Sequence, residues 1–344
     1  MSSESRIIGQ VSTTFDTAQI VSELDNIQKP IEAEMKQFED YFKKAMKSDT
    51  LLLDKITHYI IKRKGKQMRP MFVFLSSKLC GGITDSTYAA ASMIELLHTA
   101  TLVHDDVVDV SNKRRGFFSV NALWKNKIAV LVGDYLLSRG LLLSVDNNEF
   151  ELLRIVSNAV KEMSEGELLQ QEKSRLLNIT EEVYYEIIRQ KTASLIAACC
   201  HSGAAAAGAS KEQALAMKEF GLNVGLAFQI KDDLFDYGFG DKIGKPTGID
   251  LQERKMTLPL IYTIQKSDRS IRRKLVNIVK NHNTESAQVK TLVNIVIESG
   301  GIDYAVKKME EFRDKALEIL NTFPDNDARH SLAGLVHFTI NRKK

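Results

Sequence analysis

The sequence predicts an all-α protein, a single large helical bundle of ten or more helices around a central cavity. The first reason is that apolar residues recur at helical spacing along almost the whole chain from about Ala18 onward. The second is the scarcity of turn residues, because a β-sheet protein of 344 residues would need many more than the 5 prolines and 19 glycines present. Hydrophobic residues make up 44% of the chain, which is ample for a packed core.

The predicted helices follow one another with short breaks, and no long linker or repeat divides them. Residues 1–17 are polar and weakly patterned, so we expect a flexible N-terminal arm before a single domain over residues 18–344. The periodicity predicts helices over residues 51–62, 88–110, 128–145, 150–173, 181–207, 211–237, 257–265, 270–281, 286–299, 301–321 and 327–341. Turn residues separate helices at Gly81-Gly82, Asn147-Asn148, Gly238 to Gly248, Asn281 to Thr284 and Pro324-Asp325-Asn326.

The most glycine-dense segment is residues 238–248, directly after an acidic helix end. A loop of this kind beside a site can act as a mobile cover. The alternative is an ordinary surface loop, because loops of this composition are common.

Bulk composition excludes several classes of protein. The 47 basic and 44 acidic residues nearly balance, which argues against nucleic acid as a partner. The three cysteines, Cys80, Cys199 and Cys200, have no metal-site spacing and suggest a reducing compartment. We see no secretory signal and no apolar run near the roughly 20 residues that span a bilayer, so we expect a cytoplasmic protein without a stable membrane anchor.

An aspartate cluster lies in an apolar helix at residues 105–109. Asp105 and Asp109 are four residues apart, so their carboxylates lie side by side on one helix face. Like charges so placed repel each other, and a bound divalent cation removes that cost. A solvated acidic face is the alternative for a single cluster.

A second cluster repeats the same spacing at Asp232, Asp233 and Asp236. Two copies of one pattern are hard to explain as solvated faces. Carboxylate oxygens together with phosphate oxygens and water suit Mg²⁺. If the two helices face each other, the clusters can hold a diphosphate through Mg²⁺ and favour its departure as a leaving group.

Basic residues near the clusters also suit a diphosphate. Lys66 and Arg69 stand at a probable helix start with Pro70 in the first turn, which is a natural anion site. Arg114 and Arg115 closely follow the first cluster, and arginine binds phosphate bidentately. The alternatives are a solvated basic turn and a surface arginine pair.

At these motifs the chain resembles the trans-polyprenyl diphosphate synthase family, in its long-chain, octaprenyl- and heptaprenyl-like type. The resemblance runs from about Pro30 to the C-terminus with every motif in order. The matching segments are His98 to Asp109, Arg114-Arg115-Gly116, Gln229 to Asp236, Gly244-Lys245, Gly248-Ile249-Asp250, Lys255, Gly65 to Pro70 and Lys191-Thr192.

The resemblance implies an isoprenoid synthase fold, a homodimer and roles for individual residues. Isopentenyl diphosphate would bind Lys66, Arg69, His98 and Arg115. An allylic diphosphate (geranyl, farnesyl or geranylgeranyl) would bind Arg114, Lys191, Thr192, Gln229, Lys245 and Lys255. Catalysis would depend on Lys191 and on Asp105, Asp109 and Asp232, which with Asp106 and Asp236 would hold Mg²⁺, roughly three ions, or Mn²⁺. Asp233 would bind the metal, orient the water molecules bound to the metal or hold nearby lysines.

The implied reaction is a head-to-tail condensation. The allylic diphosphate departs with metal assistance, the isopentenyl double bond attacks C1 of the allylic cation, and the diphosphate takes the released proton. No side-chain base stands out. For His104, a core position or a hydrogen bond to a carboxylate is the favoured interpretation.

Product length can be argued from side-chain size. Ala100 and Thr101, one turn before Asp105, are small and leave a product tunnel open. We therefore expect a C30–C40 product for a quinone side chain, with Met93, Ile94, Leu97 or residues 131–142 deeper in the tunnel. The alternative is a short-chain C15–C20 synthase of the same family.

Three other functions remain open from the residues. A metal phosphohydrolase using His104-Asp105 would leave the second cluster unexplained. A terpene cyclase would usually carry an Asn/Ser/Glu pattern in place of the second cluster. A regulatory subunit of a heteromeric synthase would be expected to have lost cluster residues, and here both are intact.

Overall fold

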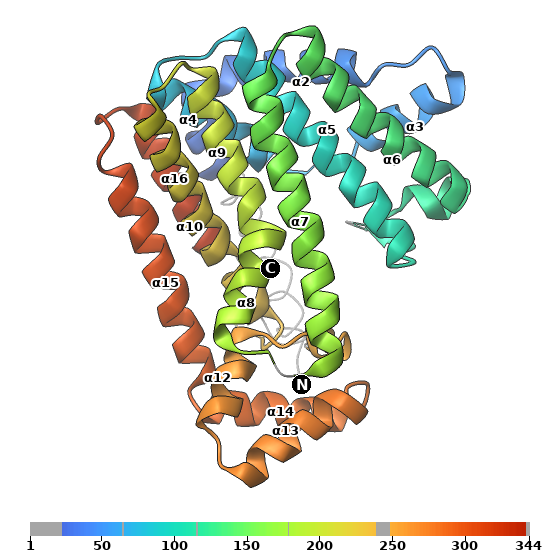
Figure 1. The fold of residues 1–344 in the computed structure, drawn as a ribbon, viewed down its shortest axis with the longest axis vertical. Helices are drawn as coiled ribbons and strands as arrows, with labels where there is room; N and C mark the ends of the chain where they lie inside the picture. The colour runs from blue at the N-terminus through green and yellow to red at the C-terminus, as the bar shows by residue number, and fades with distance from the viewer. Residues whose placement is uncertain (1–22, 64, 115, 178, 239–247, 342–344) are drawn as a thin grey trace, which may run out of the picture.

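The computed structural model describes residues 23–63, 65–114, 116–177, 179–238 and 248–341. Within these residues the chain is almost wholly helical, which confirms the all-α prediction (Figure 1). The helices are η2 (Lys29–Ile31), α2 (Glu32–Met46), α3 (Leu51–Ile61), α4 (Met68–Cys80), α5 (Asp85–Val108), α6 (Val120–Asp146), α7 (Phe150–Leu176), α8 (Glu181–Ile188), η3 (Arg189–Ala193), α9 (Ser194–Ala206), α10 (Lys211–Phe235), α11 (Ile249–Gln252), α12 (Leu258–Lys266), α13 (Arg269–Asn281), α14 (Ser286–Glu298), α15 (Gly301–Leu320) and α16 (Asp327–Asn341).

Local sequence explains where several helices begin. Ser210 and Gln213 form a reciprocal capping box at the start of α10, and the Asp268 carboxylate accepts backbone N–H bonds at the start of α13. Thr180 caps α8 by accepting the N–H of Val183 at 3.4 Å. Each cap satisfies backbone donors that the first turn leaves without a helical partner.

Three local features differ from the expected helices. The predicted helix 181–207 contains the π-helical turn η3, which divides α8 from α9. The helix expected from residue 128 begins at Val120, with Lys125 at φ +74° interrupting its first part. A two-stranded antiparallel hairpin, β1 (Lys113–Arg114) with β2 (Phe117–Phe118), was not predicted, because two-residue strands carry no periodicity.

Two sequence expectations concern residues that the structure does not describe. The predicted N-terminal arm, residues 1–17, lies outside the described residues, as does the predicted cover over most of its length, residues 239–247. Both stay predictions, and so does the domain boundary at residue 18.

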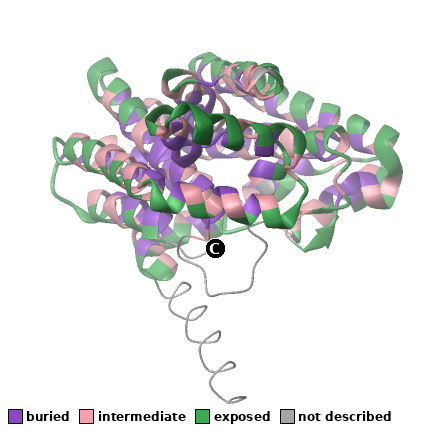
Figure 2. Cartoon of the chain, turned by 90° about the horizontal axis from the view of Figure 1, so that it is seen from below, coloured by how far each residue is buried: buried purple, intermediate pink, exposed green. Residues whose placement is uncertain are grey.

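The core lies where the long helices pack together. α9 packs against α4, α7 and α10, and α10 also runs along α15 (Figure 1). Figure 2 shows the buried residues gathered in the interior, with exposed residues along the outer faces. Large side chains such as Phe38, Phe74 and Phe220 are fully buried, and each contributes about 1.5–3 kcal/mol through burial of apolar surface.

α6 corrects one expectation from the sequence. At 27 residues, with a mean hydropathy of 1.7 over its best window, it is long and apolar enough to cross a membrane by length and composition. The expectation that no segment comes near this limit was wrong, because scattered charges such as Lys127, Asp134 and Arg139 hide the apolar character of the helix. In the described residues α6 packs along α5, but only 33% of its most apolar window is buried.

Candidate active site

The first aspartate cluster lies at the C-terminal end of α5. Asp105 and Asp109 are exposed, and the backbone N–H of Asp109 donates to the Asp105 carbonyl at 2.8 Å. A helix C-terminus carries partial negative charge, so carboxylates gathered there are unfavourable without a cation. The position of this cluster therefore favours cation binding.

Electrostatics around Asp105 point the same way. Asp105 is open to solvent on one side, but the protein atoms around its carboxylate partly desolvate it, and this raises its pKa. The neighbouring carboxylates of Asp109 and Glu167 raise the pKa further, while Arg114 and Lys191 lower it by smaller amounts. Glu167 lies on α7, so a third carboxylate from another helix joins the cluster. This accumulation of negative charge beside two cations is typical of a site that binds both metal ions and phosphate.

Asp106 points into the protein instead of toward solvent. It is 4% exposed, and its carboxylate accepts a hydrogen bond from Nε of Arg114 at 2.8 Å. Its carbonyl accepts a bond from Asn121 at 3.1 Å. Arg114 belongs to β1, so the unpredicted hairpin brings this arginine back onto the first cluster.

Side chains from α3 and from the turn after it hold the hairpin in place. The Tyr59 hydroxyl donates to the Phe118 carbonyl at 2.6 Å, and the Arg63 guanidinium lies 4.8 Å from the Phe117 ring centroid. The sequence did not indicate this contact for Tyr59 or Arg63. No local signal could have identified either role, because the contacts join distant segments.

The second cluster lies at the end of α10, and its three aspartates differ in burial. Asp233 is 6% exposed and accepts hydrogen bonds from the Tyr184 hydroxyl at 2.7 Å and from Gln229 Nε2 at 2.8 Å. Burial and the nearby Asp250 raise the pKa of Asp233 to about 7, against the lowering effect of those two hydrogen bonds. Asp236 is also buried, whereas Asp232 is half-buried and the most accessible of the three.

The central Lys191-Thr192 pair connects the two clusters. Lys191 forms an ion pair with Glu167 and donates to Gln170 at 3.2 Å, on the same face of α7 that approaches Asp105. Thr192 donates to Gln229 at 2.7 Å, one turn before Asp233 on α10. The structure therefore brings together residues that the sequence placed in three separate motifs.

The π-helical turn η3 explains how Lys191 and Thr192 reach toward the two aspartate clusters. A π turn inserts an extra residue into a helix, which rotates the side chains that follow, and such turns recur at functional sites. Close packing holds η3 in position. A Cβ built on Gly166 of α7 would lie 2.7 Å from the backbone N of Lys191, so only glycine allows this approach.

A small cavity of about 80 Å³ lies beside these residues. Its lining includes Lys191, Thr192, Gln229, Asp233 and Lys255. Burial alone would lower the pKa of Lys255, but its hydrogen bonds and charge interactions with Glu253 and Asp250 outweigh burial and raise it. Lys255 therefore stays a cation at neutral pH and suits a phosphate group.

A larger hollow of about 720 Å³ lies elsewhere, between α7, α9 and α10.

The basic residues predicted at a helix start lie where the sequence placed them. α4 begins at Met68, with Arg69 and Pro70 in its first turn. Arg69 Nε donates to Glu95 on α5 at 2.7 Å, and the Lys66 ammonium lies 5.0 Å from the Phe338 ring centroid of α16. His98 is half-buried on α5, one turn beyond Glu95. The predicted residues Arg115 and Lys245 lie outside the described residues.

His104 faces away from the clusters, toward α6. Its Nε2 lies 3.3 Å from the Val130 carbonyl and 3.5 Å from the Asp134 carboxylate. A Cβ on Gly133 would lie 2.2 Å from Nε2, so the imidazole occupies the space that this glycine leaves. The contact with α6 agrees with a packing or carboxylate-bonding histidine.

The carboxylates fit Mg²⁺ as it is usually bound with phosphates. Among the residues that the structure describes, no three His, Cys, Asp or Glu side chains gather closely enough to hold an ion by themselves. Mg²⁺ rarely occupies such all-protein cages and usually takes one or two carboxylates together with water and substrate phosphates. The exposed Asp105 and Asp109 and the accessible Asp232 supply oxygen donors of that kind.

Comparison with known proteins gives consistent matches over nearly the whole chain. The profile of the family described as polyprenyl synthetase matches residues 50–296. The all-trans-nonaprenyl-diphosphate synthase (geranyl-diphosphate specific) of Rhodobacter capsulatus is 35% identical over 320 residues, 92% of this chain and 97% of that protein.

Two solved structures are similar along their full length. A polyprenyl synthase from Caulobacter crescentus, crystallised with calcium and isoprenyl diphosphate, aligns with a TM-score of 0.84 and 35% identity over 93% of this chain and 98% of that one. A geranylgeranyl pyrophosphate synthase from Bacteroides thetaiotaomicron aligns with a TM-score of 0.79 and 36% identity over 93% of this chain and 100% of that one.

Proposed function

This chain belongs to the polyprenyl synthetase family and is a prenyltransferase, and we propose that it builds a long-chain, C30–C40 polyprenyl diphosphate from isopentenyl diphosphate and an allylic diphosphate. The observation that carries the reaction is the Lys191-Thr192 pair on η3. Lys191 reaches the α7 face beside Asp105, and Thr192 reaches Gln229 beside the second cluster. One short segment thus connects the two acidic groups that would hold the allylic diphosphate.

The cofactor that we propose is Mg²⁺, in roughly three ions, with Mn²⁺ as a substitute. Asp105, Asp109 and Asp232 would bind it directly, with Asp106 and Asp236 as further candidates. When bound, the metal would neutralise the negative charge that develops on the departing diphosphate. Asp233 has a different role in this proposal: its buried hydrogen bonds to Tyr184 and Gln229 hold the end of α10 in place.

The basic side chains bind and orient the two diphosphates. Lys191, Thr192, Gln229 and Lys255 line the cavity on the allylic side. Arg114 would contact the same diphosphate from the first cluster, where it pairs with Asp106. Lys66, Arg69 and His98, near the start of α4 and along α5, would hold isopentenyl diphosphate. No described residue is needed as a base, because the departing diphosphate can take the proton that the new chain loses. Arg115 and Lys245 keep their proposed diphosphate contacts as predictions.

The long-chain assignment depends on the residues before the first cluster. Ala100 is buried and Thr101 is half-buried on α5, and neither blocks the space beside the helix as a large aromatic ring would. Deeper along α5, Met93 and Ile94 are fully buried, and Leu97 packs against Gly140 of α6. The nonaprenyl product in the name of the Rhodobacter relative supports a long chain, while the geranylgeranyl synthase likeness keeps a C15–C20 product as the alternative.

We also propose a cytoplasmic homodimer without a stable membrane anchor. An apolar row on the outer face of α6 carries exposed residues at helical spacing, among them Leu131 at 55% and Leu142 at 48%. A second copy packed along this row would bury it, because contiguous exposed apolar surface often marks a site of protein association. Free cysteines at all three positions favour a reducing compartment.

The test is a product assay with the purified chain, Mg²⁺, farnesyl diphosphate and isopentenyl diphosphate. We expect C30–C40 products, and a loss of at least about 100-fold in kcat for Asp105→Ala and for Asp232→Ala, since each removes charge stabilisation at the reacting diphosphate. Asp40→Ala, an exposed aspartate on α2, is the matched control.

The product assay tests the roles of the clusters, the product length and the reaction itself separately. Unchanged activity in both variants would overturn the roles of the clusters. Products that stop at C15–C20 would contradict the long-chain assignment while leaving the prenyltransferase reaction intact. Phosphate release without isopentenyl diphosphate would point to a phosphohydrolase instead.

A further inference from the structure

A second hollow in the described structure is separate from the aspartate clusters. It is a groove of about 720 Å³ between α7, α9 and α10, and none of the residues proposed for diphosphate or metal binding lines it. Its volume falls within the roughly 300–1,000 Å³ typical of small-molecule sites. The proposed reaction gives this groove no role.

The two ends of the groove differ because of helix direction. α9 and α10 are joined by the short turn at residues 207–210 and run in opposite directions (Figure 1). Arg154 in the first turns of α7 influences the pKa of His201 near the end of α9, while Glu162 further along α7 contacts Arg189 before the start of α9. α7 and α10 therefore both begin at the end of the groove where α9 ends, so two helix ends with partial positive charge meet one with partial negative charge.

Cations collect at that end. Arg154, Lys211 and Lys218 line it as cations. His201 lies among them as a neutral imidazole at pH 7, because burial and then the charges of Lys218 and Arg154 lower its pKa. Three carboxylates, Glu151, Glu162 and Glu219, also line the groove, against four lysines and arginines. Glu162 is taken up by Arg189 at the other end, so Arg154, Lys211 and Lys218 exceed the remaining two carboxylates. In the described part of the chain, Arg154, Lys211 and Lys218 form no ion pair.

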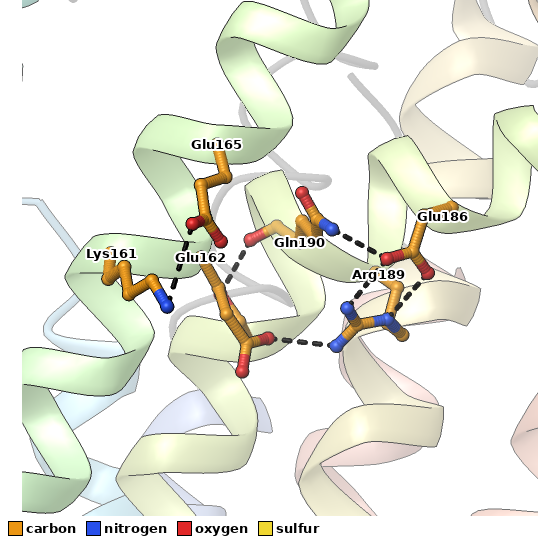
Figure 3. Close-up of polar contacts among 7 residues, drawn as sticks. Lys161, Glu162, Glu165, Glu186, Arg189 and Gln190 are labelled. Carbon is orange, nitrogen blue, oxygen red and sulfur yellow. Dashed lines mark hydrogen bonds and ion pairs between the residues drawn. The ribbon is translucent and has the colours of Figure 1, made fainter.

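At the opposite end of the groove the arginine is already paired with carboxylates. Arg189 pairs with Glu162 at 2.8 Å and with Glu186 at 2.8 Å, and Gln190 also donates to Glu186 (Figure 3). These partners satisfy the arginine, so this end offers no unpaired charge to a ligand. The free positive charge of the groove is therefore confined to the end formed by Arg154, His201 and Lys218.

The floor between the two ends is apolar. Ile155, Ala159 and Ala198 form a small buried cluster there, and Ala197 and Leu222 extend it along the groove. Short alanine side chains leave open space where larger ones would fill it. A ligand lying in this groove would therefore meet positive charge at one end and an apolar surface along its length.

We propose that the α7–α9–α10 groove binds a small amphipathic organic phosphate. The phosphate lies among Arg154, His201 and Lys218, and the apolar chain lies along the alanine-lined floor. A purely ionic ligand would leave the floor unused, and a neutral lipid would leave the cations without a partner. Because the groove is about 720 Å³, it accommodates a ligand with a medium-length chain.

The experiment is calorimetric titration of the full chain with octyl phosphate, in EDTA so that no divalent ion contributes at the catalytic clusters. We expect saturable binding, at least tenfold weaker in the double variant Arg154→Ala/Lys218→Ala. The double variant Arg273→Ala/Lys290→Ala, which removes the same charge from exposed positions on α13 and α14, should bind as the native chain does. Inorganic phosphate and octanol alone should each bind at least tenfold more weakly than octyl phosphate.

A second readout is specific to the groove. The imidazole signals of His201, assigned by His201→Gln, should move on titration with octyl phosphate, and the phosphate should raise the pKa of His201. Equal affinity in the Arg154→Ala/Lys218→Ala variant, or unmoved His201 signals, would overturn the proposal. Binding only to vesicles that contain phosphatidic acid, with none to free octyl phosphate, would overturn it in favour of a membrane surface. Asp105→Ala should keep the binding, so failure of the proposed catalytic roles would be recognised separately.

Discussion

At the scale of single residues, burial separates the aspartates that face substrate from one that holds the helix. Asp105 and Asp109 lie at the surface of the cluster, whereas Asp233 is enclosed and hydrogen-bonded by Tyr184 and Gln229. A buried carboxyl costs free energy unless hydrogen bonds compensate it. Tyr184 is therefore part of the site although it touches no substrate in this proposal, whereas Gln229 both holds Asp233 and lines the allylic cavity.

Tyr184→Phe tests that role. Removing the hydroxyl leaves Asp233 with one fewer donor in a buried place, and we expect a loss of about 1–3 kcal/mol in the free energy of unfolding. Urea unfolding measures it. Tyr262→Phe, which removes a hydroxyl from α12, is the control, and equal stability of the two variants would contradict the anchoring role.

The lowered pKa of His201 predicts how the free energy of unfolding changes with pH. Burial and the nearby Lys218 and Arg154 lower its pKa in the folded state, so the unfolded chain takes up a proton that the folded chain resists. Stability should therefore fall as pH drops below about 6.5, the ordinary histidine pKa.

In His201→Gln this contribution is absent, and the decrease in Tm between pH 7.5 and pH 5.5 should be smaller than in the native chain. Thermal unfolding at the two pH values measures the difference. His58→Gln, which removes an exposed imidazole from α3, should behave as the native chain does. If His201→Gln retained the whole decrease, other groups would account for it.

At the scale of helices, close approach positions the reactive groups. α10 passes η3 at Gly225, where an added Cβ would lie 2.4 Å from the Cα of Ala193. This contact sets the distance between Thr192 on η3 and Gln229 on α10. A side chain at Gly225 would therefore act on the site without touching substrate.

Gly225→Ala should force α10 and η3 apart, at a cost of about 1–3 kcal/mol in stability, and kcat should fall as the Thr192–Gln229 bond lengthens. Urea unfolding and the product assay measure the two effects. In Gly334→Ala the new Cβ would meet only the Ile27 side chain, 3.0 Å from Cγ1 and 3.5 Å from Cδ1, and no backbone atom, so its stability should change less than that of Gly225→Ala. Similar losses in the two variants would mean that the approach of α10 to η3 is not critical.

At the scale of the whole molecule, the bundle converts distant segments into one site. Helices α5, α7 and α10 and the turn η3 each contribute side chains, and the hairpin after α5 adds Arg114. The smaller helices α12, α13 and α14 lie across one end of the bundle (Figure 1). The apolar row on α6 lies on the outside, where a second copy can pack without blocking the clusters.

Leu131→Glu combined with Leu142→Glu should convert a dimer to monomers, because burying two carboxylates in an apolar interface is unfavourable. Light scattering coupled to size-exclusion chromatography gives the mass. Ile271→Glu combined with Ile297→Glu makes the same change at exposed positions on α13 and α14 and should stay dimeric. A monomeric native chain would contradict the homodimer itself.

Local sequence was enough to predict the helical class, most helix positions from residue 51 onward and the two aspartate clusters, whereas α2 and the extent of α4 were not predicted. The predicted features are local properties, because the 3.6-residue period and the i, i+4 spacing of Asp105 and Asp109 can be read within a few turns of chain. The helix start at Arg69 and Pro70 was also predictable from nearby residues. The two-residue strands and the π turn were not, since neither has a periodic pattern of its own.

Only the tertiary structure decided which of these residues meet. Glu167, Gln170 and Tyr184 join the site from other helices, and nothing in their own neighbourhood marks them. The groove between α7, α9 and α10 likewise exists only once three helices have packed. Side-chain periodicity determines which face of a helix is buried, but the packing of helices far apart in the sequence determines what that face touches.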